Sequence, residues 1–217
     1  MIELVAADDH RFAAYLAEPQ GTAKGGVVIV HEIFGLTDQM RRFADTLAAS
    51  GYRCIVPAMF DRVEPGLVVD YADFKRGGQA AMSIEIPALL ADLDAARRAV
   101  EVDGKAAVAG FCWGGTVAYM GACGQPFACA VSWYGGGIHG LVGRMQPKVP
   151  VMYHFGADDA FIPGSAIDEI RAADPDGMFY VYAAAGHGFC CDDREGFNAE
   201  AAERSLERSM AFLEAHL

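Results

Sequence analysis

Basic residues are scarce in this chain, and their scarcity limits the partners that it can have. Its 217 residues include 17 Lys and Arg against 29 Asp and Glu, which gives a formal net charge of −12. A protein that neutralises nucleic-acid phosphates or adheres to an anionic membrane needs clustered positive charge. We therefore expect neither nucleic acid nor a membrane surface as a partner, although one local cation could still bind a small anionic substrate.

The sequence also lacks any apolar run of transmembrane length, and its first residues, MIELVAADDHRF, have neither the basic stretch nor the apolar core of a signal peptide. No C-x-x-C pair occurs among the six cysteines, so neither a zinc ribbon nor a thioredoxin-like site is expected. Cysteines without a secretory signal predict free thiols in a cytoplasmic protein. Internal repeats and Pro- or Ser-rich linkers are missing too, so we expect one domain over residues 1–217, without a separate cap domain.

What the chain does contain is a regular alternation of apolar runs and helical patterns. Strands are expected at 2–6, 11–17, 26–31, 53–56, 106–110, 129–133, 150–155 and 178–182. Helices are expected at 38–49, 80–100 with Pro87 near a break, 114–123, 164–173 and 198–215, and residues 66–78 are expected to form an irregular connector. This order predicts an α/β fold: an antiparallel pair of strands, then a mostly parallel sheet with helices on both faces. Loops at the carboxyl ends of parallel strands meet at one edge, where we expect the site.

The segment Gly110-Phe111-Cys112-Trp113-Gly114-Gly115 joins an apolar strand to the first turn of a helix. Strand, G-x-C-x-G, helix is the nucleophile-elbow pattern, with cysteine in the usual serine position. So sharp a turn strains the backbone of its central residue, and side chains two residues before and after it would collide. The pattern predicts acyl chemistry by a thiolate at Cys112. A buried cysteine in a glycine-rich turn is the alternative.

A cysteine nucleophile needs a histidine as its base and an acid that orients the histidine. In the α/β-hydrolase order, the acid and then the histidine follow the nucleophile. After Cys112 the chain offers Asp158 and Asp159 behind one predicted strand, and His187 behind the next. Both the order and the placement fit a triad of Cys112, His187 and one of the two aspartates. The other aspartate could cap the helix that follows.

An oxyanion hole would complete this machinery. The expected donors are the N–H of Trp113, directly after the nucleophile, and the N–H of Ile33, in the loop after the third strand. Glu32 ends that apolar strand, so we expect its carboxylate to be partly buried. Beside Cys112 it would disfavour the thiolate until something displaces it, unless it is only a solvated loop residue.

These motifs resemble those of the dienelactone hydrolase family, the carboxymethylenebutenolidases of the α/β-hydrolase superfamily. The likeness covers nearly the whole chain, through HEIFG at 31–35, Pro57 with the MFDR that follows soon after, GFCWGG at 110–115, HFGADDAFIP at 154–163 and AGHGFCCDDR at 185–194. The resemblance implies an α/β-hydrolase fold and a triad of Cys112, Asp159 and His187, because the family's acid lies three residues after a glycine, here Gly156. It also implies that Glu32 restrains the thiol until substrate binds.

The resemblance further implies hydrolysis of dienelactone, a conjugated enol lactone with a carboxylate, to maleylacetate through a cysteine thioester. The family holds that carboxylate with two arginines. Lys75 and Arg76 lie where the first is expected, but Cys191 occupies the second position and Arg194 follows nearby. The candidate substrate-binding residues are Phe34, Lys75, Arg76 and Arg194. The departure at Cys191 leaves a general carboxylesterase for small neutral esters, with the same triad, as the alternative.

Two interpretations outside ester hydrolysis stay open from the residues alone. The fold could serve as a non-catalytic binding module, whose cysteine would not react with iodoacetamide at neutral pH. A metal site could use His187, Cys190, Cys191, Asp192 and Asp193, although adjacent cysteines chelate poorly. We expect no cofactor and no metal, a small-molecule lactone or ester as the partner, and a monomer or small homo-oligomer.

Overall fold

In the computed structural model, which describes residues 1–217, eight strands form one sheet in the order β1-β2-β4-β3-β5-β6-β7-β8. The strands are β1 (Ile2–Val5), β2 (Arg11–Ala17), β3 (Gly26–Val30), β4 (Arg53–Pro57), β5 (Ala106–Phe111), β6 (Ala130–Trp133), β7 (Val151–Gly156) and β8 (Met178–Tyr182). β1 and β2 are antiparallel additions at one edge, and every neighbouring pair from β4 to β8 is parallel. The mostly parallel sheet predicted from the alternating pattern is confirmed.

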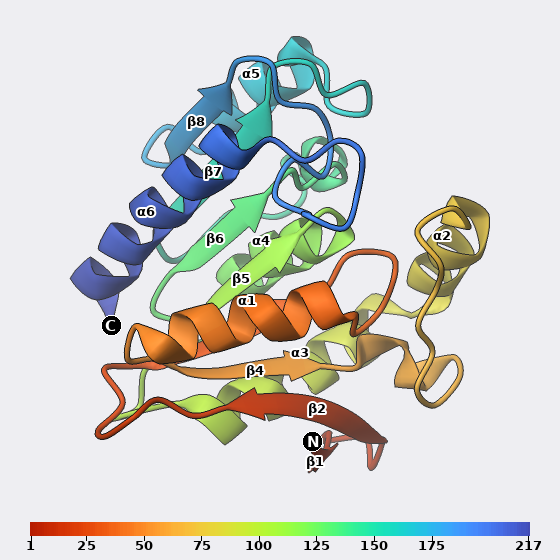
Figure 1. Ribbon diagram of the computed structural model, residues 1–217, viewed down its shortest axis with the longest axis vertical. Helices are drawn as coiled ribbons and strands as arrows, with labels where there is room; N and C mark the ends of the chain where they lie inside the picture. Colours follow the sequence, from red (N-terminus) through yellow and green to blue (C-terminus); the bar gives the residue numbers. More distant parts are fainter.

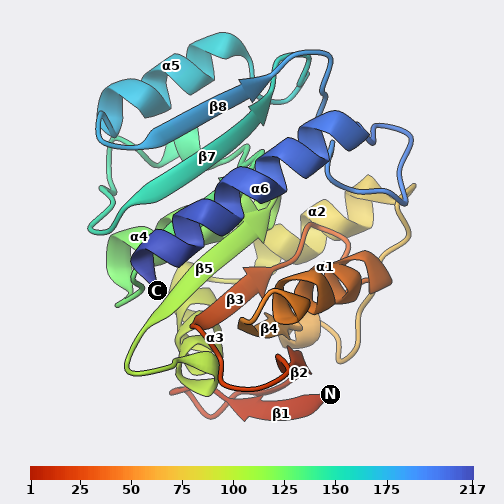
Figure 2. The same cartoon turned by 60° about the vertical axis from the view of Figure 1, so that its left-hand side comes forward.

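Helices cover both faces of this sheet. They are α1 (Asp38–Ala49), α2 (Phe74–Ser83), α3 (Ile86–Val100), α4 (Trp113–Gly124), α5 (Gly164–Ala173) and α6 (Ala199–His216), with 3-10 turns η1 (Met59–Arg62) and η2 (Ile138–Gly140). α1 and α6 lie in front of the sheet and α3, α4 and α5 behind it, while α2 stands apart near the carboxyl ends of the parallel strands (Figure 1, Figure 2). None of these helices combines the length and the apolar character needed to cross a bilayer.

The sequence prediction is wrong in part for the region before the fifth strand. The break that it places near Pro87 is confirmed, because α2 ends at Ser83 and α3 begins at Ile86. The irregular connector expected at 66–78 is wrong at its end, because α2 already begins at Phe74. Asp73 starts α2 by accepting the N–H of Arg76 at 3.0 Å, a local signal that hydrophobic periodicity does not contain. The backbone turns extended at residues 84 and 85, just before Pro87, because proline ends one helix but fits the first turn of the next.

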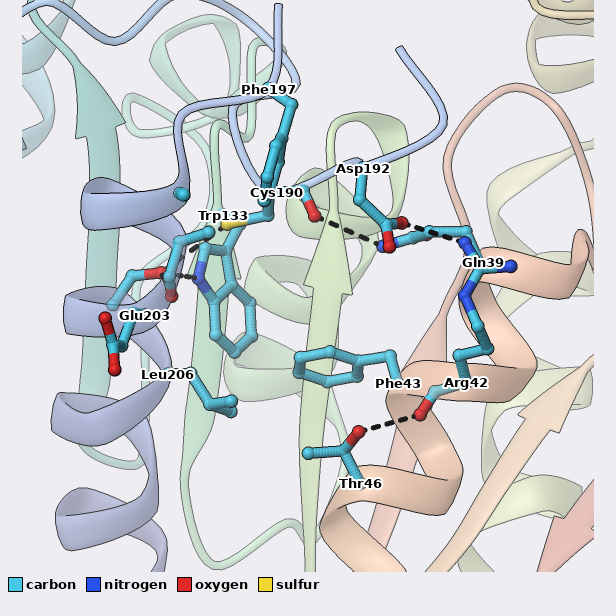
Figure 3. A pocket seen from close by; sticks show the side chains of 13 residues that line it. Gln39, Arg42, Phe43, Thr46, Trp133, Cys190, Asp192, Phe197, Glu203 and Leu206 are labelled. Carbon is cyan, nitrogen blue, oxygen red and sulfur yellow. Dashed lines mark hydrogen bonds and ion pairs between the residues drawn. The ribbon is translucent and has the colours of Figure 1, made fainter.

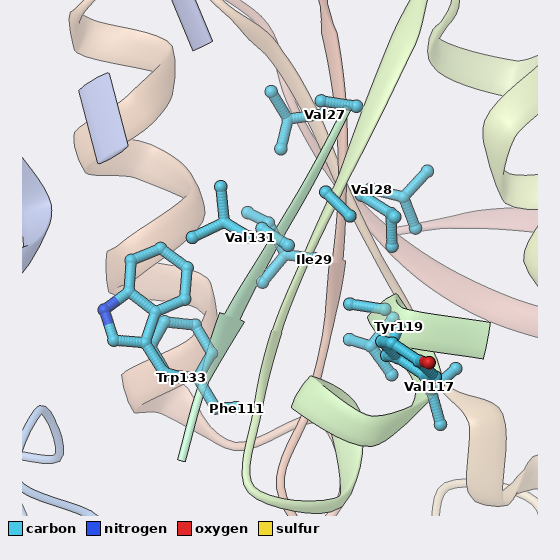
Figure 4. Packing of buried hydrophobic residues seen from close by; sticks show 14 of the residues in the cluster. Val27, Val28, Ile29, Phe111, Val117, Tyr119, Val131 and Trp133 are labelled. Atoms are coloured by element: carbon cyan, nitrogen blue, oxygen red, sulfur yellow. The ribbon is translucent and has the colours of Figure 1, made fainter. Parts of the chain in front are cut away.

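The central strands are buried on both faces, as their continuous apolar runs predict. Val27, Ile29 and Val131 point toward α1, and Val28 points to the opposite side, where Val117 of α4 lies (Figure 4). This alternation gives one main core of 57 buried residues, whereas a separate cluster of six buried residues lies under α2 and the segment before it. The main core therefore anchors the strand ends, after which the candidate site residues lie.

Candidate active site

The turn between β5 and α4 holds Cys112 in a strained backbone conformation. Cys112 has φ 54° and ψ −117°, a region that residues other than glycine rarely occupy. A methyl group on Gly110 would lie 2.0 Å from the Gly114 carbonyl oxygen, and one on Gly114 would lie 2.2 Å from the Val30 carbonyl oxygen. Glycine is therefore required on both sides of Cys112, as in a nucleophile elbow, and the thiol lies half-buried in the wall of a cavity.

His187 and Asp159 reach Cys112 from the loops after β8 and β7. His187 Nε2 lies 3.0 Å from Cys112 Sγ, and His187 Nδ1 lies 2.8 Å from Asp159 Oδ2. The other carboxylate oxygen of Asp159 accepts the backbone N–H of Phe161 at 2.8 Å. Asp158, the other candidate acid, is exposed. The structure thus brings the thiol, the imidazole and one carboxylate into a single run of hydrogen bonds.

The charge of His187 is set by competing effects. Burial disfavours the imidazolium, but the hydrogen bonds to Asp159 and Cys112 outweigh it and raise the pKa of His187 to about 10. The imidazole also has aromatic neighbours, because Tyr134 and Phe161 lie edge-on to it with ring centroids 5.1 and 5.2 Å away. The site therefore holds the ring in place and favours its protonated form, which stabilises a neighbouring thiolate.

The two predicted oxyanion donors lie beside the thiol. Ile33 and Trp113 line the same cavity as Cys112. The Ile33 N–H donates no hydrogen bond within the protein. Trp113 is the first residue of α4, where an N–H has no acceptor in the preceding turn of its own helix. Both groups are therefore available to a bound oxyanion.

Glu32 is only 3% exposed, and its partner is Arg194 rather than Cys112. Glu32 Oε2 lies 3.5 Å from Arg194 Nη1, while Oε1 has no hydrogen-bond partner. Burial raises the pKa of Glu32, and the positive charges of Arg194 and His187 oppose that rise. The carboxyl that was expected to act on the thiol is thus held in a buried ion pair next to the triad.

These groups surround a cavity of about 470 Å³. Its lining consists of Ile33, Phe34, Phe74, Cys112, Trp113, Thr116, Gly136, Gly137, Phe161, His187 and Arg194. The Arg194 guanidinium stacks on two of the aromatic rings, 5.2 Å from the Phe34 centroid and 5.5 Å from the Phe74 centroid. The cavity is therefore mostly aromatic and apolar, and it contains one arginine.

The structure brings only two of the four predicted substrate-binding residues to this cavity, namely Phe34 and Arg194. Lys75 and Arg76 do not line it. Both are exposed on α2, and Arg76 pairs with Glu64 at 3.1 Å on the surface. Their sequence position near the site did not reveal which face of α2 they occupy.

A second cavity of about 410 Å³ lies between α1 and α6 (Figure 3). Trp133, Phe43 and Leu206 form part of its apolar wall, and Cys190 reaches it with its sulfur 3.5 Å from Ser205 Oγ. No histidine lines this cavity, and burial raises the pKa of the Cys190 thiol well above its ordinary value. Of these two cavities, only the one at Cys112 combines a thiol with a histidine.

The side chains of the possible metal site make separate contacts. His187 bonds to its triad partners, Cys190 faces a serine, and Asp192 and Asp193 each pair with Arg42 at 2.8 Å. No group of three or more histidine, cysteine, aspartate or glutamate side chains is arranged to hold a metal ion. The hypothesis of a metal site at these five residues therefore has no geometric support.

Sequence reasoning missed Tyr134, which is fully buried behind the triad. Its φ of 40° is unusual for a residue other than glycine, and its hydroxyl has no hydrogen-bond partner although the Glu32 carboxyl is near. A signal was available, because Tyr134 directly follows β6 at the edge where the other site residues lie. Phe74 and Phe161 were missed as lining residues because a single exposed aromatic residue carries no pattern.

A cysteine on a strained strand-to-helix turn, followed by an acid and a histidine on later loops of a mostly parallel sheet, defines the protein as an α/β-hydrolase. Comparison with known proteins identifies the family within this class. Residues 12–217 match the model of the dienelactone hydrolase family. A carboxymethylenebutenolidase of Pseudomonas putida is 30% identical over 98% of this chain and 94% of its own. The chain belongs to the dienelactone hydrolase family and is a hydrolase of esters or lactones.

Solved structures have the same architecture. A Klebsiella pneumoniae protein provisionally classed as a dienelactone hydrolase has a TM-score of 0.84 at 26% identity, covering 100% of this chain and 99% of the other. A dienelactone hydrolase-like promiscuous phosphotriesterase from metagenomic libraries has a TM-score of 0.78 at 26% identity, covering 100% of this chain and 97% of the other. The fold class and the family predicted from the sequence are confirmed.

Proposed function

We propose that this chain hydrolyses a small activated lactone or ester through a thioester on Cys112, with His187 as the base and Asp159 as the acid that orients it. The observation that carries this proposal is the hydrogen-bonded run from Cys112 Sγ through His187 to Asp159, at 3.0 and 2.8 Å, in the wall of a cavity. A binding module would not require three separate loops to converge in this order.

The proposed reaction has two halves. The Cys112 thiolate adds to the carbonyl carbon, and the N–H groups of Ile33 and Trp113 bind the resulting oxyanion. The bond from that carbon to the leaving oxygen then breaks, and His187 gives its proton to the leaving enolate or alkoxide. In the second half, water adds to the thioester while His187 takes a proton from it, and the carbon–sulfur bond breaks to restore the thiolate.

Glu32 and Arg194 are proposed to adjust the thiol to the substrate. A buried carboxylate disfavours a thiolate beside it, and the ion pair with Arg194 at 3.5 Å draws the Glu32 carboxylate toward the guanidinium. A substrate carboxylate bound at Arg194 would compete with Glu32 for that guanidinium. The charge next to Cys112 would then depend on what occupies the cavity.

Dienelactone, or a close analogue that carries a carboxylate, is the substrate that we propose first. Arg194 supplies a largely buried cation in the cavity, and the Pseudomonas putida relative is a carboxymethylenebutenolidase. Leaving a buried carboxylate without a partner costs on the order of several kcal/mol, so a cation at this place favours an anionic substrate. A thiol nucleophile also suits an enol lactone, because its leaving group is already a good one.

A carboxylesterase for small neutral esters is the second candidate. Cys191 is fully buried at the position where the family has its second arginine. Lys75 and Arg76 do not line the cavity, so a substrate carboxylate would meet a single arginine, which Glu32 already pairs. The remaining wall is aromatic and suits an uncharged acyl group.

Hydrolysis of an enol lactone and of an aryl ester tests the triad. Cys112→Ala and His187→Ala should each lower turnover of both substrates by roughly 10⁴-fold or more. Acid-quenched wild-type protein should carry an acyl group on the Cys112 peptide in mass spectrometry. Unimpaired turnover in either variant would overturn the assignment. The ratio of kcat/KM for dienelactone and for a neutral ester of similar size then decides between the two substrate classes.

A further inference from the structure

Helix α2 lies directly against the loop that carries Ile33, and a glycine makes this contact possible. A methyl group on Gly77 would lie 2.2 Å from the Ile33 carbonyl oxygen, 3.1 Å from its carbonyl carbon and 3.3 Å from its Cβ. Real Cβ atoms essentially never approach another heavy atom to within 3.0 Å. Only glycine therefore permits α2 to pack this closely on the Ile33 peptide.

Two further contacts join the same loop to the segment before α2. Val69 donates its N–H to the Phe34 carbonyl oxygen at 2.9 Å, and Gly35 forms an isolated β-bridge with Val68. A methyl group on Gly35, which has φ 84°, would lie 2.4 Å from the Leu67 carbonyl oxygen. Three successive residues, 33 to 35, are thus contacted by α2 and the segment before it.

This packing bears on catalysis because it acts directly beside the proposed oxyanion donor. The Ile33 N–H shares its peptide with the Glu32 carbonyl, which accepts the Gly35 N–H at 3.3 Å and lies 2.6 Å from His31 Nδ1. The Ile33 carbonyl, in the next peptide, takes part in no hydrogen bond and faces Gly77. An oxyanion donor is effective only when its direction is fixed before the reaction begins. Hydrogen bonds thus hold the backbone before Ile33, and the packing of α2 holds the backbone after it.

We propose that Gly77 is a positioning residue for acyl transfer: because it lacks a side chain, α2 can pack on the Ile33 carbonyl and so help hold the backbone of Ile33, whose N–H is the proposed oxyanion donor. The inference rests on the proposed function, since it assumes that the Ile33 N–H binds the oxyanion. Gly77 touches no reacting atom and acts through the Ile33 backbone. Its neighbour Gly78 has no heavy atom within 4 Å of the place where its Cβ would lie, and so provides a matched control in the same helix.

Gly77→Ala and Gly78→Ala should therefore behave differently. Gly77→Ala should lower kcat for an aryl ester by roughly 10- to 100-fold, with KM changed by less than about threefold, because small displacements of a positioned donor weaken transition-state binding. Gly78→Ala should keep kcat within about twofold of wild type and raise the melting temperature slightly, because alanine is the better helix former. Equal kcat in the two variants would overturn the proposal.

Alkylation by iodoacetamide separates an effect on the oxyanion from an effect on the thiol. The Cys112 thiolate displaces iodide from this reagent without adding to a carbonyl, so no oxyanion forms. In Gly77→Ala, iodoacetamide should alkylate Cys112 at the wild-type rate, whereas the ester should acylate Cys112 slowly. Mass spectrometry of the Cys112 peptide measures both rates. Equal slowing of both reactions would indicate a general distortion of the site and would contradict the proposal.

Ala80→Gly serves if Gly77→Ala does not fold. Ala80 lies in the six-residue cluster under α2, apart from the main core, and glycine there loosens α2 without adding an atom. We again expect slower acylation with normal alkylation, and unchanged acylation would count against the positioning role. Cys112→Ala distinguishes a failure of the proposed function from a failure of the positioning role of Gly77. If it retains turnover, the proposed function fails; if it is inactive while Gly77→Ala and Ala80→Gly match wild type, only the positioning role fails.

Discussion

The active-site cavity has two walls of different construction. One wall consists of strand ends and tight turns that carry Cys112, Asp159 and His187 on the main core of 57 buried residues. The other belongs to residues 60–85, packs on a cluster of only six buried residues, and presents to the cavity Phe74, which is 47% exposed. The proposed reacting groups lie on the wall that cannot shift without disturbing the core. The second wall can vary at little cost to the fold, which suits it to substrate selection.

The largest expected effect is on the first wall, at the acid. Asp159→Asn should lower kcat by roughly 10⁴-fold, because the amide no longer holds His187 in the correct tautomer or stabilises its charge. Asp158→Asn is the matched control, since Asp158 is exposed and makes no contact with the triad. Steady-state hydrolysis of an aryl ester by both variants measures the difference. Equal losses in the two would remove the distinction between these neighbouring aspartates.

The pH dependence of the free energy of unfolding should show how tightly His187, on the first wall, binds its proton in the folded state. The folded state raises the pKa of His187 from 6.5 to about 10, so it binds this proton more tightly than the unfolded chain. The resulting stability is complete below pH 6.5 and is lost as pH rises toward 10, by up to about 1.4 kcal/mol for each pH unit. The free energy of unfolding in urea, wild type minus His187→Gln, should therefore decrease from pH 7 to pH 10. A difference that stays constant would mean that the pKa is not raised.

The turn that holds the nucleophile should tolerate no added atom. Gly114→Ala would place a methyl group 2.2 Å from the Val30 carbonyl oxygen, so we expect a loss of about 1–3 kcal/mol in the free energy of unfolding together with a fall in kcat. Gly124→Ala, in the same helix with open space around its Cβ, should instead gain about 0.5–1 kcal/mol. Denaturant unfolding of both variants tests this contrast, and a tolerated Gly114→Ala would show that the turn can relax.

Arg194, whose guanidinium stacks on Phe74 of the second wall, should affect substrate choice with the smallest change in energy. Arg194→Gln should reduce the kcat/KM ratio of a carboxylated lactone to a neutral ester by roughly tenfold or more, the order expected for a charged hydrogen bond. Arg76→Gln, on the exposed face of α2, should leave the ratio within about twofold. A ratio that is insensitive to Arg194 would favour the neutral-ester candidate.

Much of the first wall could be predicted from the sequence, because its signals are local or follow chain order. Continuous apolar runs predicted the buried strands, and the glycines around Cys112 predicted the strained turn. The order of Cys112, two adjacent aspartates and His187 behind the fifth, seventh and eighth strands predicted that a triad would form there, and the family resemblance selected Asp159. The structure places Cys112, His187 and Asp159 within hydrogen-bonding distance. The second wall was predicted poorly. α2 starts from an Asp73 cap in a stretch without clear periodicity, so its bounds and its exposed face were not visible.

By itself, the sequence determined the fold class and which residue types meet at the edge of the sheet, because strand periodicity and chain order encode these directly. The family followed from the resemblance of its motifs. Only the tertiary structure decided that Glu32 pairs with Arg194, that Lys75 and Arg76 point away from the cavity, and that α2 packs on the Ile33 peptide through Gly77. These features depend on side-chain directions and on close approaches between segments distant in the sequence. No local pattern records a 2.2 Å constraint between residues 33 and 77, since it exists only after both segments have packed.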